Sequence, residues 1–271
     1  MDRRRFLAGS GGALGLSLVA PRTAHAAPKP RLVDPRFSQF GQGGDPDHGV
    51  WDALLSKGVK MGRDGVARFD YARVDRNALN GYLTNLQAVD PRTLSSGAAF
   101  AYWVNLYNTL TVAVVAEAYP VSSIRRIGGS VLQPGPWRAK RVEVTSVALS
   151  LDDIEHGILR PVWRDPRIHY AVNCASIGCP NLAPTAYRAG QLERMLTTGA
   201  RAYVNHPRGV TVTGQGAVVS SIYHWFKVDF GGQDAGVLEH LRAFAADDQA
   251  TRLGPVRRIV DHRYDWALND I

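Results

Sequence analysis

The sequence AAFAYWVNLYNTLTVAVVAEA, residues 98–118, decides the fold of this chain. On a helix, its aromatic and aliphatic side chains cover nearly every face, which predicts a helix buried in a core rather than one on a surface. Ser95 or Ser96 can cap its first turn. Tyr119 precedes Pro120 and ends the helix, because the residue before a proline disfavours helical geometry. The stretch therefore predicts one long central helix.

The length of this helix also fits a membrane span. Polar side chains interrupt it at Asn105, Asn108, Thr109, Thr111 and Glu117, which favours a buried helix of a globular core. Asn105 and Thr109 lie one turn apart, and buried polar groups need hydrogen-bond partners. They either line a polar cleft or, as we favour, fasten the helix to a neighbouring backbone.

Outward from this helix, the hydrophobic periodicity predicts shorter elements on both sides. Helices are expected in residues 50–55, 76–89, 151–161, 191–204, 221–230 and 237–246, and strands in residues 66–71, 141–145, 147–149, 168–173, 210–213, 217–220 and 259–261. This mixture predicts an α+β fold in which the buried central helix packs against a mostly antiparallel sheet.

The N-terminus has the pattern of an export signal. Arg3, Arg4, Phe6 and Leu7 form a twin-arginine pattern, a weakly apolar run follows, and residues 24–26 are a small-x-small cleavage site. The twin-arginine type carries cargo across the membrane already folded. We therefore expect a periplasmic or secreted protein.

Three parts are expected along the chain. They are a signal peptide in residues 1–26, a linker in residues 27–49 and a single α+β domain in residues 50–271, with no transmembrane segment in the mature chain. The 271 residues are 45% hydrophobic and 21% charged, which suffices for one sizeable core. The net charge is +8, but the arginines are scattered, which favours a solvated basic surface and no nucleic-acid partner.

The sequence HYAVNCASIGCP, residues 169–180, contains both cysteines and is the centre of the predicted site. In an oxidising compartment Cys174 and Cys179 either form a small disulfide or remain free thiols, and the sequence leaves both open. If the segment begins as a strand, His169 and Cys174 face opposite sides and pair only if the chain bends at Asn173.

Another histidine is an equal candidate partner for the thiol. His156 lies in a short helix beside Glu155, in acidic surroundings that can tune an imidazole. The predicted site therefore has three walls: the segment 169–180, the helix around His156, and the Asn105 face of the central helix.

Several blocks together resemble the domain of unknown function 547 family. They are residues 101–111, AYWVNLYNTLT, residues 149–160, LSLDDIEHGILR, and residues 165–180, DPRIHYAVNCASIGCP, with residues 225–230 and 264–269 fitting the same pattern. The resemblance implies an α+β domain and, more loosely, a similarity to papain-like or transglutaminase-like folds. In such folds a cysteine at a helix N-terminus works with a histidine and an acid or amide. Here the large helix carries no cysteine and both cysteines follow the histidines, which implies a rearranged or inactive site.

The first functional hypothesis is a cysteine-dependent hydrolase or acyl transferase acting on amide or ester bonds in the cell envelope. The candidate catalytic residues are Cys174, His156, His169, Glu155, Asn105 and Asn173. In this hypothesis the thiol is the nucleophile, one histidine is the base, an asparagine orients the imidazole or donates to an oxyanion, and Glu155 or Asp153 holds the histidine tautomer.

The second hypothesis is a non-catalytic binding module of the envelope. A structural Cys174–Cys179 disulfide and a buried network of the two histidines, Asn105 and Glu155 would shape a cleft for a peptide or glycan. A zinc site on the histidines and cysteines ranks last, because Cys-x4-Cys is not a common chelating spacing. We expect no metal and no cofactor, and an unknown peptide, glycan or ester as the partner.

Overall fold

The computed structural model describes residues 29–130 and 135–271, so the predicted signal peptide lies outside the described residues. The α-helices are α1 (Gly49–Gly58), α2 (Arg76–Ala88), α3 (Ser96–Ala118), α4 (Leu151–Ile154), α5 (Arg160–Trp163), α6 (Ile168–Ala171), α7 (Leu192–Val204), α8 (Ser221–Trp225), α9 (Asp234–Phe244) and α10 (Asp247–Leu253). The 3₁₀-helices are η1 (Pro35–Ser38), η2 (Pro91–Thr93), η3 (Ile124–Arg126), η5 (Ala189–Gln191) and η6 (Lys227–Phe230), and η4 (Glu155–Leu159) is a π-helix. The strands are β1 (Val59–Met61), β2 (Ala67–Phe69), β3 (Val142–Val144), β4 (Val147–Leu149), β5 (Val210–Thr213), β6 (Gly216–Ser220) and β7 (Ile259–Arg263).

The central helix α3 is confirmed. The Ser95 hydroxyl caps it by accepting a hydrogen bond from the Ala98 amide at 3.4 Å. Of the described helices, α3 alone is long and apolar enough to cross a membrane, and 94% of its apolar window is buried inside the protein. It is therefore the core helix that its all-round apolar pattern predicts.

The α+β class is also confirmed, but the predicted support for α3 is wrong in detail. The strands form three small sheets: the antiparallel pairs β1–β2 and β3–β4, and a three-stranded sheet in which β6 pairs antiparallel with β5 and parallel with β7. Helices α2 and α4, not a sheet, pack along α3. The hairpin strands are too short to join into one sheet that would cover a helix of this length.

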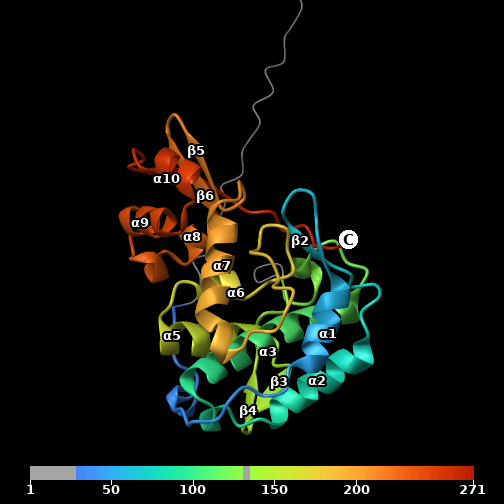
Figure 1. Ribbon diagram of the computed structural model, residues 1–271. Coiled ribbons are helices and arrows are strands. Elements are labelled where there is room, and N and C mark those ends of the chain that lie inside the picture. The colour runs from blue at the N-terminus through green and yellow to red at the C-terminus, as the bar shows by residue number, and fades with distance from the viewer. Residues whose placement is uncertain (1–28, 131–134) are drawn as a thin grey trace, which may run out of the picture.

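Two apolar clusters divide the interior. The first surrounds α3, and the second lies among α7, α9, β5 and β6, in the orange and red part of Figure 1. Helix α6 contributes to both, because Ile168 belongs to the first cluster and Tyr170 to the second. The segment that carries His169 therefore joins the two clusters.

The predicted strand in residues 168–173 is wrong, because the chain forms the short helix α6 there. The Asp165 carboxylate accepts a hydrogen bond from the Arg167 amide, and the Ile168 amide donates to the Asp165 carbonyl, so the turn begins before the apolar residues. Helical geometry lets Ile168 and Tyr170 reach different clusters. The alternation of faces that separated His169 from Cys174 no longer applies.

The described part of the predicted linker, residues 29–49, packs against the domain. The Arg31 and Val33 amides donate to the carbonyls of His156 and Gly157 at 3.1 and 2.9 Å. Phe37 is 1% exposed and lies edge-on against a core tryptophan of α3. This segment is a docked part of the fold.

Candidate functional site

Five ionisable side chains meet where helix α6 joins the two apolar clusters, and we call them the charged cluster: Glu155, His156, Arg160, His169 and Asp229. His169 Nε2 lies 2.7 Å from Asp229 Oδ2, and its Nδ1 lies 3.6 Å from Glu155 Oε1. The Arg160 guanidinium donates to both oxygens of Asp229, at 2.6 and 3.1 Å. His156 lies 3.8 Å from Glu155. The His169 and Arg160 side chains are each 2% exposed, so these ion pairs are well shielded from water.

A π-helical turn places the acid and the first histidine of this cluster. In η4 the backbone hydrogen bonds connect residues five apart instead of the four of an α-helix. Such π-helical turns are frequent at functional sites. Gly157 allows the docked N-terminal segment to approach, since a Cβ atom there would lie 3.1 Å from the Val33 Cβ. The hydrogen bonds from residues 31–33 stabilise the widened turn.

The protonation states in the cluster follow from burial and neighbouring charges. Burial lowers the pKa of His169, but its hydrogen bonds to Asp229 and Glu155 outweigh burial, so the pKa is raised. Burial raises the pKa of both carboxyl groups, and the adjacent histidines and Arg160 reverse this, so the pKa of each is lowered to about 2. Burial lowers the pKa of His156 to about 4. The two carboxylates thus favour the cationic form of His169, and His156 is neutral near pH 7.

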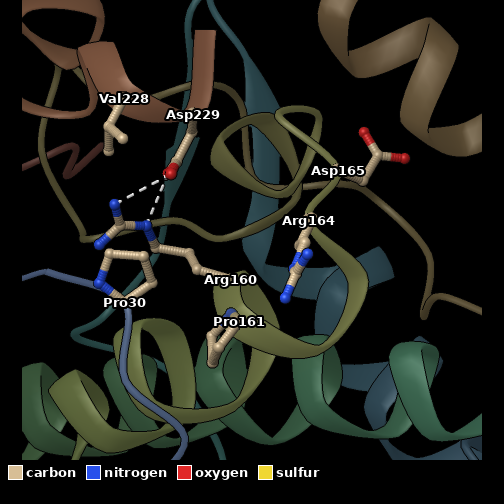
Figure 2. Close-up of a pocket in the computed structure, with 7 residues that line it drawn as sticks. All are labelled: Pro30, Arg160, Pro161, Arg164, Asp165, Val228 and Asp229. Carbon is tan, nitrogen blue, oxygen red and sulfur yellow. Dashed lines mark hydrogen bonds and ion pairs between the residues drawn. The ribbon is translucent and has the colours of Figure 1, made fainter. Parts of the chain in front are cut away.

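Two pockets border the charged cluster. The first, of about 370 Å³, is shown in Figure 2, where the Arg160 guanidinium meets the Asp229 carboxylate beside Arg164. The second, of about 520 Å³, is lined by His156 and Asp152 and by basic side chains. Burial and the nearby Glu155 raise the pKa of Asp152 to about 6. Only the edges of the cluster therefore face these pockets, while His169 is enclosed.

Both cysteines lie in a separate structure, the thiol loop, residues 173–180. The Cys174 Sγ atom lies 2.7 Å from Cys179 Sγ, 3.2 Å from Ser176 Oγ and 3.1 Å from the Tyr264 hydroxyl. Both cysteines are free thiols. The loop is paired with the C-terminal tail, because the amides of residues 177 and 178 donate to the carbonyls of residues 267 and 265. This pairing places Tyr264 over the thiol.

Four partly exposed aromatic side chains extend from the thiol loop, and we call them the aromatic surface: Trp137, Trp225, Tyr264 and Trp266. The Trp225 ring lies 4.9 Å from Tyr264 and 5.5 Å from Trp266. The Trp266 ring also contacts Tyr264, at 4.6 Å, and Trp137, at 5.7 Å. Arg125 lies 5.2 Å from the centre of the Trp266 ring. The four rings therefore form one group in which Trp266 contacts the other three and Arg125 lies over Trp266.

The structure brings some of the predicted catalytic residues together and separates others. Glu155, His156 and His169 meet as predicted. Cys174 does not join them, since its thiol contacts Cys179, Ser176 and Tyr264 and no histidine within the described residues. Tyr107 of α3 is influenced by both groups, because burial and then the charges of Glu155 and the two cysteines raise its pKa. The predicted thiol–histidine pair is absent from the described residues.

The two candidate asparagines hold the backbone. Asn105 accepts a hydrogen bond from the Tyr187 amide and donates to the Tyr187 carbonyl, each at 2.9 Å. This is the fastening role that we favoured for the polar face of the central helix. Asn173 donates to the Pro180 carbonyl at 2.7 Å and accepts from the Ala175 amide at 2.8 Å, and so closes the thiol loop. Neither amide faces the charged cluster.

The hypothesis of a zinc site needs the histidines and cysteines to converge, and they lie in different groups. Within residues 29–130 and 135–271, no group of three or more His, Cys, Asp and Glu side chains is arranged to hold a metal ion.

Sequence reasoning missed Arg160 and Asp229 in the charged cluster and Tyr264 and Trp266 beside the thiol. An acid in the first turn and an arginine in the last turn of residues 151–161 match the helix dipole, which concealed the role of Arg160 in a buried pair. Asp229 reaches His169 from 60 residues along the chain, a contact that no local pattern signals.

Comparison with known families supports the resemblance noted from the sequence blocks. Residues 91–204 match the family described as "Protein of unknown function, DUF547", so this part of the chain is a domain of that family. The matched region contains Glu155, His156, His169 and both cysteines, whereas Asp229 and the tail lie outside it. Comparisons with curated proteins and with solved structures give no match, and a papain-like relationship has no support from them.

Proposed function

We propose that this protein is exported to the cell envelope and binds a glycan there through the aromatic surface. The observation that carries the proposal is the chemistry of that surface. Its rings are partly exposed and in mutual contact, and the indole N–H groups of Trp137, Trp225 and Trp266 donate to none of the described residues. A sugar offers the complementary features, namely apolar ring faces and oxygen acceptors.

Residue type supports the same proposal. Tryptophan, tyrosine and arginine contribute most of the energy at recognition surfaces, because they present large rigid areas with a polar edge. Arg125 extends this set, because it lies over the Trp266 ring. Isolated apolar side chains at the surface need no explanation, but a contiguous group of partly exposed rings is a candidate binding site.

The geometry supports binding more than turnover. A thiol hydrolase needs a base within hydrogen-bonding reach of its nucleophile. His169 is engaged by two carboxylates, and neither histidine contacts Cys174 within the described chain. The hydrogen bond to Cys179, together with burial, raises the Cys174 pKa well above its usual value, so that Cys174 becomes a thiolate only if Cys179, and not a histidine, accepts its proton.

A cysteine-dependent hydrolase or acyl transferase is the second candidate, because Cys174 is partly exposed directly under Tyr264. In that case the aromatic surface would hold an amide or ester of the envelope beside the thiol. Replacing Cys174 by alanine separates the two candidates, because a hydrolase would lose all turnover while a binding module would retain its ligand.

Cosedimentation with insoluble peptidoglycan tests the binding proposal. We expect Trp225→Ala and Trp266→Ala to weaken retention by roughly tenfold or more, since each removes a large contact area. Trp163→Ala is the matched control, because Trp163 is also partly exposed but packs against Phe40 and Phe100 elsewhere on the molecule. If all three variants cosedimented with peptidoglycan to the same extent, the proposal would be contradicted. It would also be contradicted if the protein bound the peptides of peptidoglycan after the glycan had been removed.

A further inference from the structure

The two cysteine sulfurs are held together without a covalent bond. Cys174 Sγ and Cys179 Sγ lie 2.7 Å apart, and the Cys174 amide donates to Cys179 Sγ at 2.9 Å. Cys174 is partly exposed, whereas Cys179 is 4% exposed. The pair therefore joins a residue that reaches the surface, Cys174, to an enclosed one, Cys179.

The backbone of the thiol loop keeps this arrangement. Ala175 adopts a left-handed conformation with φ of 59°, which is unfavourable for a residue with a side chain. The Asn173 carboxamide accepts from the Ala175 amide, and the Ala175 carbonyl accepts from the Asn269 amide at 3.2 Å. Several hydrogen bonds thus hold a strained turn whose effect is to bring the sulfurs together.

The two thiols differ in acidity. Burial raises the pKa of Cys179, but hydrogen bonds donated by the Cys174 thiol and by Tyr264 more than offset burial, so the pKa is lowered. The Cys174 pKa is raised by the same hydrogen bond. Cys179 is therefore the more acidic thiol of the pair and the acceptor of the hydrogen bond from Cys174.

We propose that Cys174 and Cys179 are a redox-active dithiol that exchanges with disulfide-bearing molecules, with Cys174 as the attacking residue. Cys174 transfers its proton to Cys179 while its sulfur attacks a disulfide R–S–S–R, so that an S–S bond forms at Cys174 and RS⁻ leaves. Cys179 then loses its proton to the released thiolate or to solvent and attacks the Cys174 sulfur, and the second RS⁻ leaves. The protein dithiol is oxidised to a disulfide, and R–S–S–R is reduced to two thiols.

This inference does not rest on glycan binding, because it uses only the thiol loop and its hydrogen bonds. It also differs from a permanent structural disulfide. In the described thiol form, the loop is already closed by Asn173 and by the C-terminal tail, so closure does not require the S–S bond.

Glutathione disulfide and mass spectrometry of the folded full chain test the proposal. Wild-type protein should lose two hydrogen atoms and retain no adduct, and excess dithiothreitol should restore its mass. Cys179→Ser should trap one glutathione on Cys174. Cys174→Ser should react at least roughly tenfold more slowly than Cys179→Ser, since its remaining thiol, Cys179, is enclosed.

The same reactions in urea provide the control, because both single-cysteine variants should then react at similar rates. Circular dichroism before the reaction verifies that each variant is folded. Faster labelling of Cys179 than of Cys174 in folded protein would overturn the assigned roles. A wild-type protein that stays reduced in excess glutathione disulfide, or that dithiothreitol cannot return to the thiol form, would overturn the redox activity itself.

Discussion

His169 Nε2 lies 2.7 Å from Asp229 Oδ2 and thereby joins helix α6, which contributes to both apolar clusters, to η6 of the second cluster. Arg160 shares the same carboxylate. A buried histidine with carboxylates on both ring nitrogens cannot easily accept a proton from a distant thiol. The His169–Asp229 pair therefore fits a role in stabilising the fold better than a role in catalysis.

Removing the shared carboxylate should destabilise the fold. Asp229→Asn leaves the enclosed Arg160 and His169 cations with a neutral partner, and we expect a loss of about 3 kcal/mol in the free energy of unfolding. Urea denaturation measures this. Glu193→Gln is the control, because Glu193 pairs with Arg167 at the exposed surface and should change stability little. Equal stability of the two variants would mean that the cluster contributes nothing.

The stability contributed by His169 should depend on pH in a defined direction. Its pKa is raised in the folded state, so the folded protein binds the proton more tightly than the unfolded chain, whose imidazole titrates near pH 6.5. The stabilisation is complete below that value and is lost as the pH rises through the folded pKa. We expect the advantage of wild type over His169→Gln, measured in urea titrations, to shrink as the pH is raised above about 6.5. An advantage that grows over this range would refute the assignment of His169 as a cation.

The fastening role of Asn105 predicts a structural defect. Asn105→Ala leaves the amide and carbonyl of Tyr187 without their partner in a buried site, at a cost of about 2 to 4 kcal/mol. Asn80→Ala, an exposed position of α2, should shift stability by less than about 0.5 kcal/mol. Thermal unfolding compares them. An Asn105→Ala protein with wild-type stability and lost ligand binding would instead place this amide in a site.

The export proposal rests on the N-terminal sequence. Replacing Arg3 and Arg4 together by lysine should keep the precursor in the cytoplasm, whereas Arg5→Lys, between the pair and Phe6, should leave export intact. Cell fractionation followed by mass determination reads out both location and cleavage. Exported wild-type protein should begin near Ala27. Export that is unaffected by the double substitution would remove the twin-arginine assignment.

Local signals were sufficient for most of the fold. The all-round apolar pattern located α3, and the apolar periodicity located α2, which Asp75 caps by accepting hydrogen bonds from two amides at 3.0 Å. The strand prediction for residues 168–173 failed because alternating apolar residues fit both a strand and a short helix that contributes to two apolar clusters. The turn at Asp165, which decides the matter, is set by hydrogen bonds that the alternation does not encode.

The candidate site was only half predictable for a related reason. Glu155, His156 and His169 lie in neighbouring segments, so their meeting was foreseeable. The partners that define each group, Asp229 for the histidine and Tyr264 for the thiol, come from distant segments and depend on how the chain packs. Proximity in sequence favoured a pair of Cys174 with a histidine, but in the folded chain the thiol and the histidines lie in different groups of side chains.

Calorimetric titration with a soluble tetrasaccharide of N-acetylglucosamine measures glycan binding itself. We expect a saturable heat of binding to the wild-type protein that Cys174→Ala retains and that Trp266→Ala loses. The absence of a binding heat, a heat unchanged in Trp266→Ala, or a continuous heat of turnover abolished in Cys174→Ala would contradict the proposed binding function of the aromatic surface.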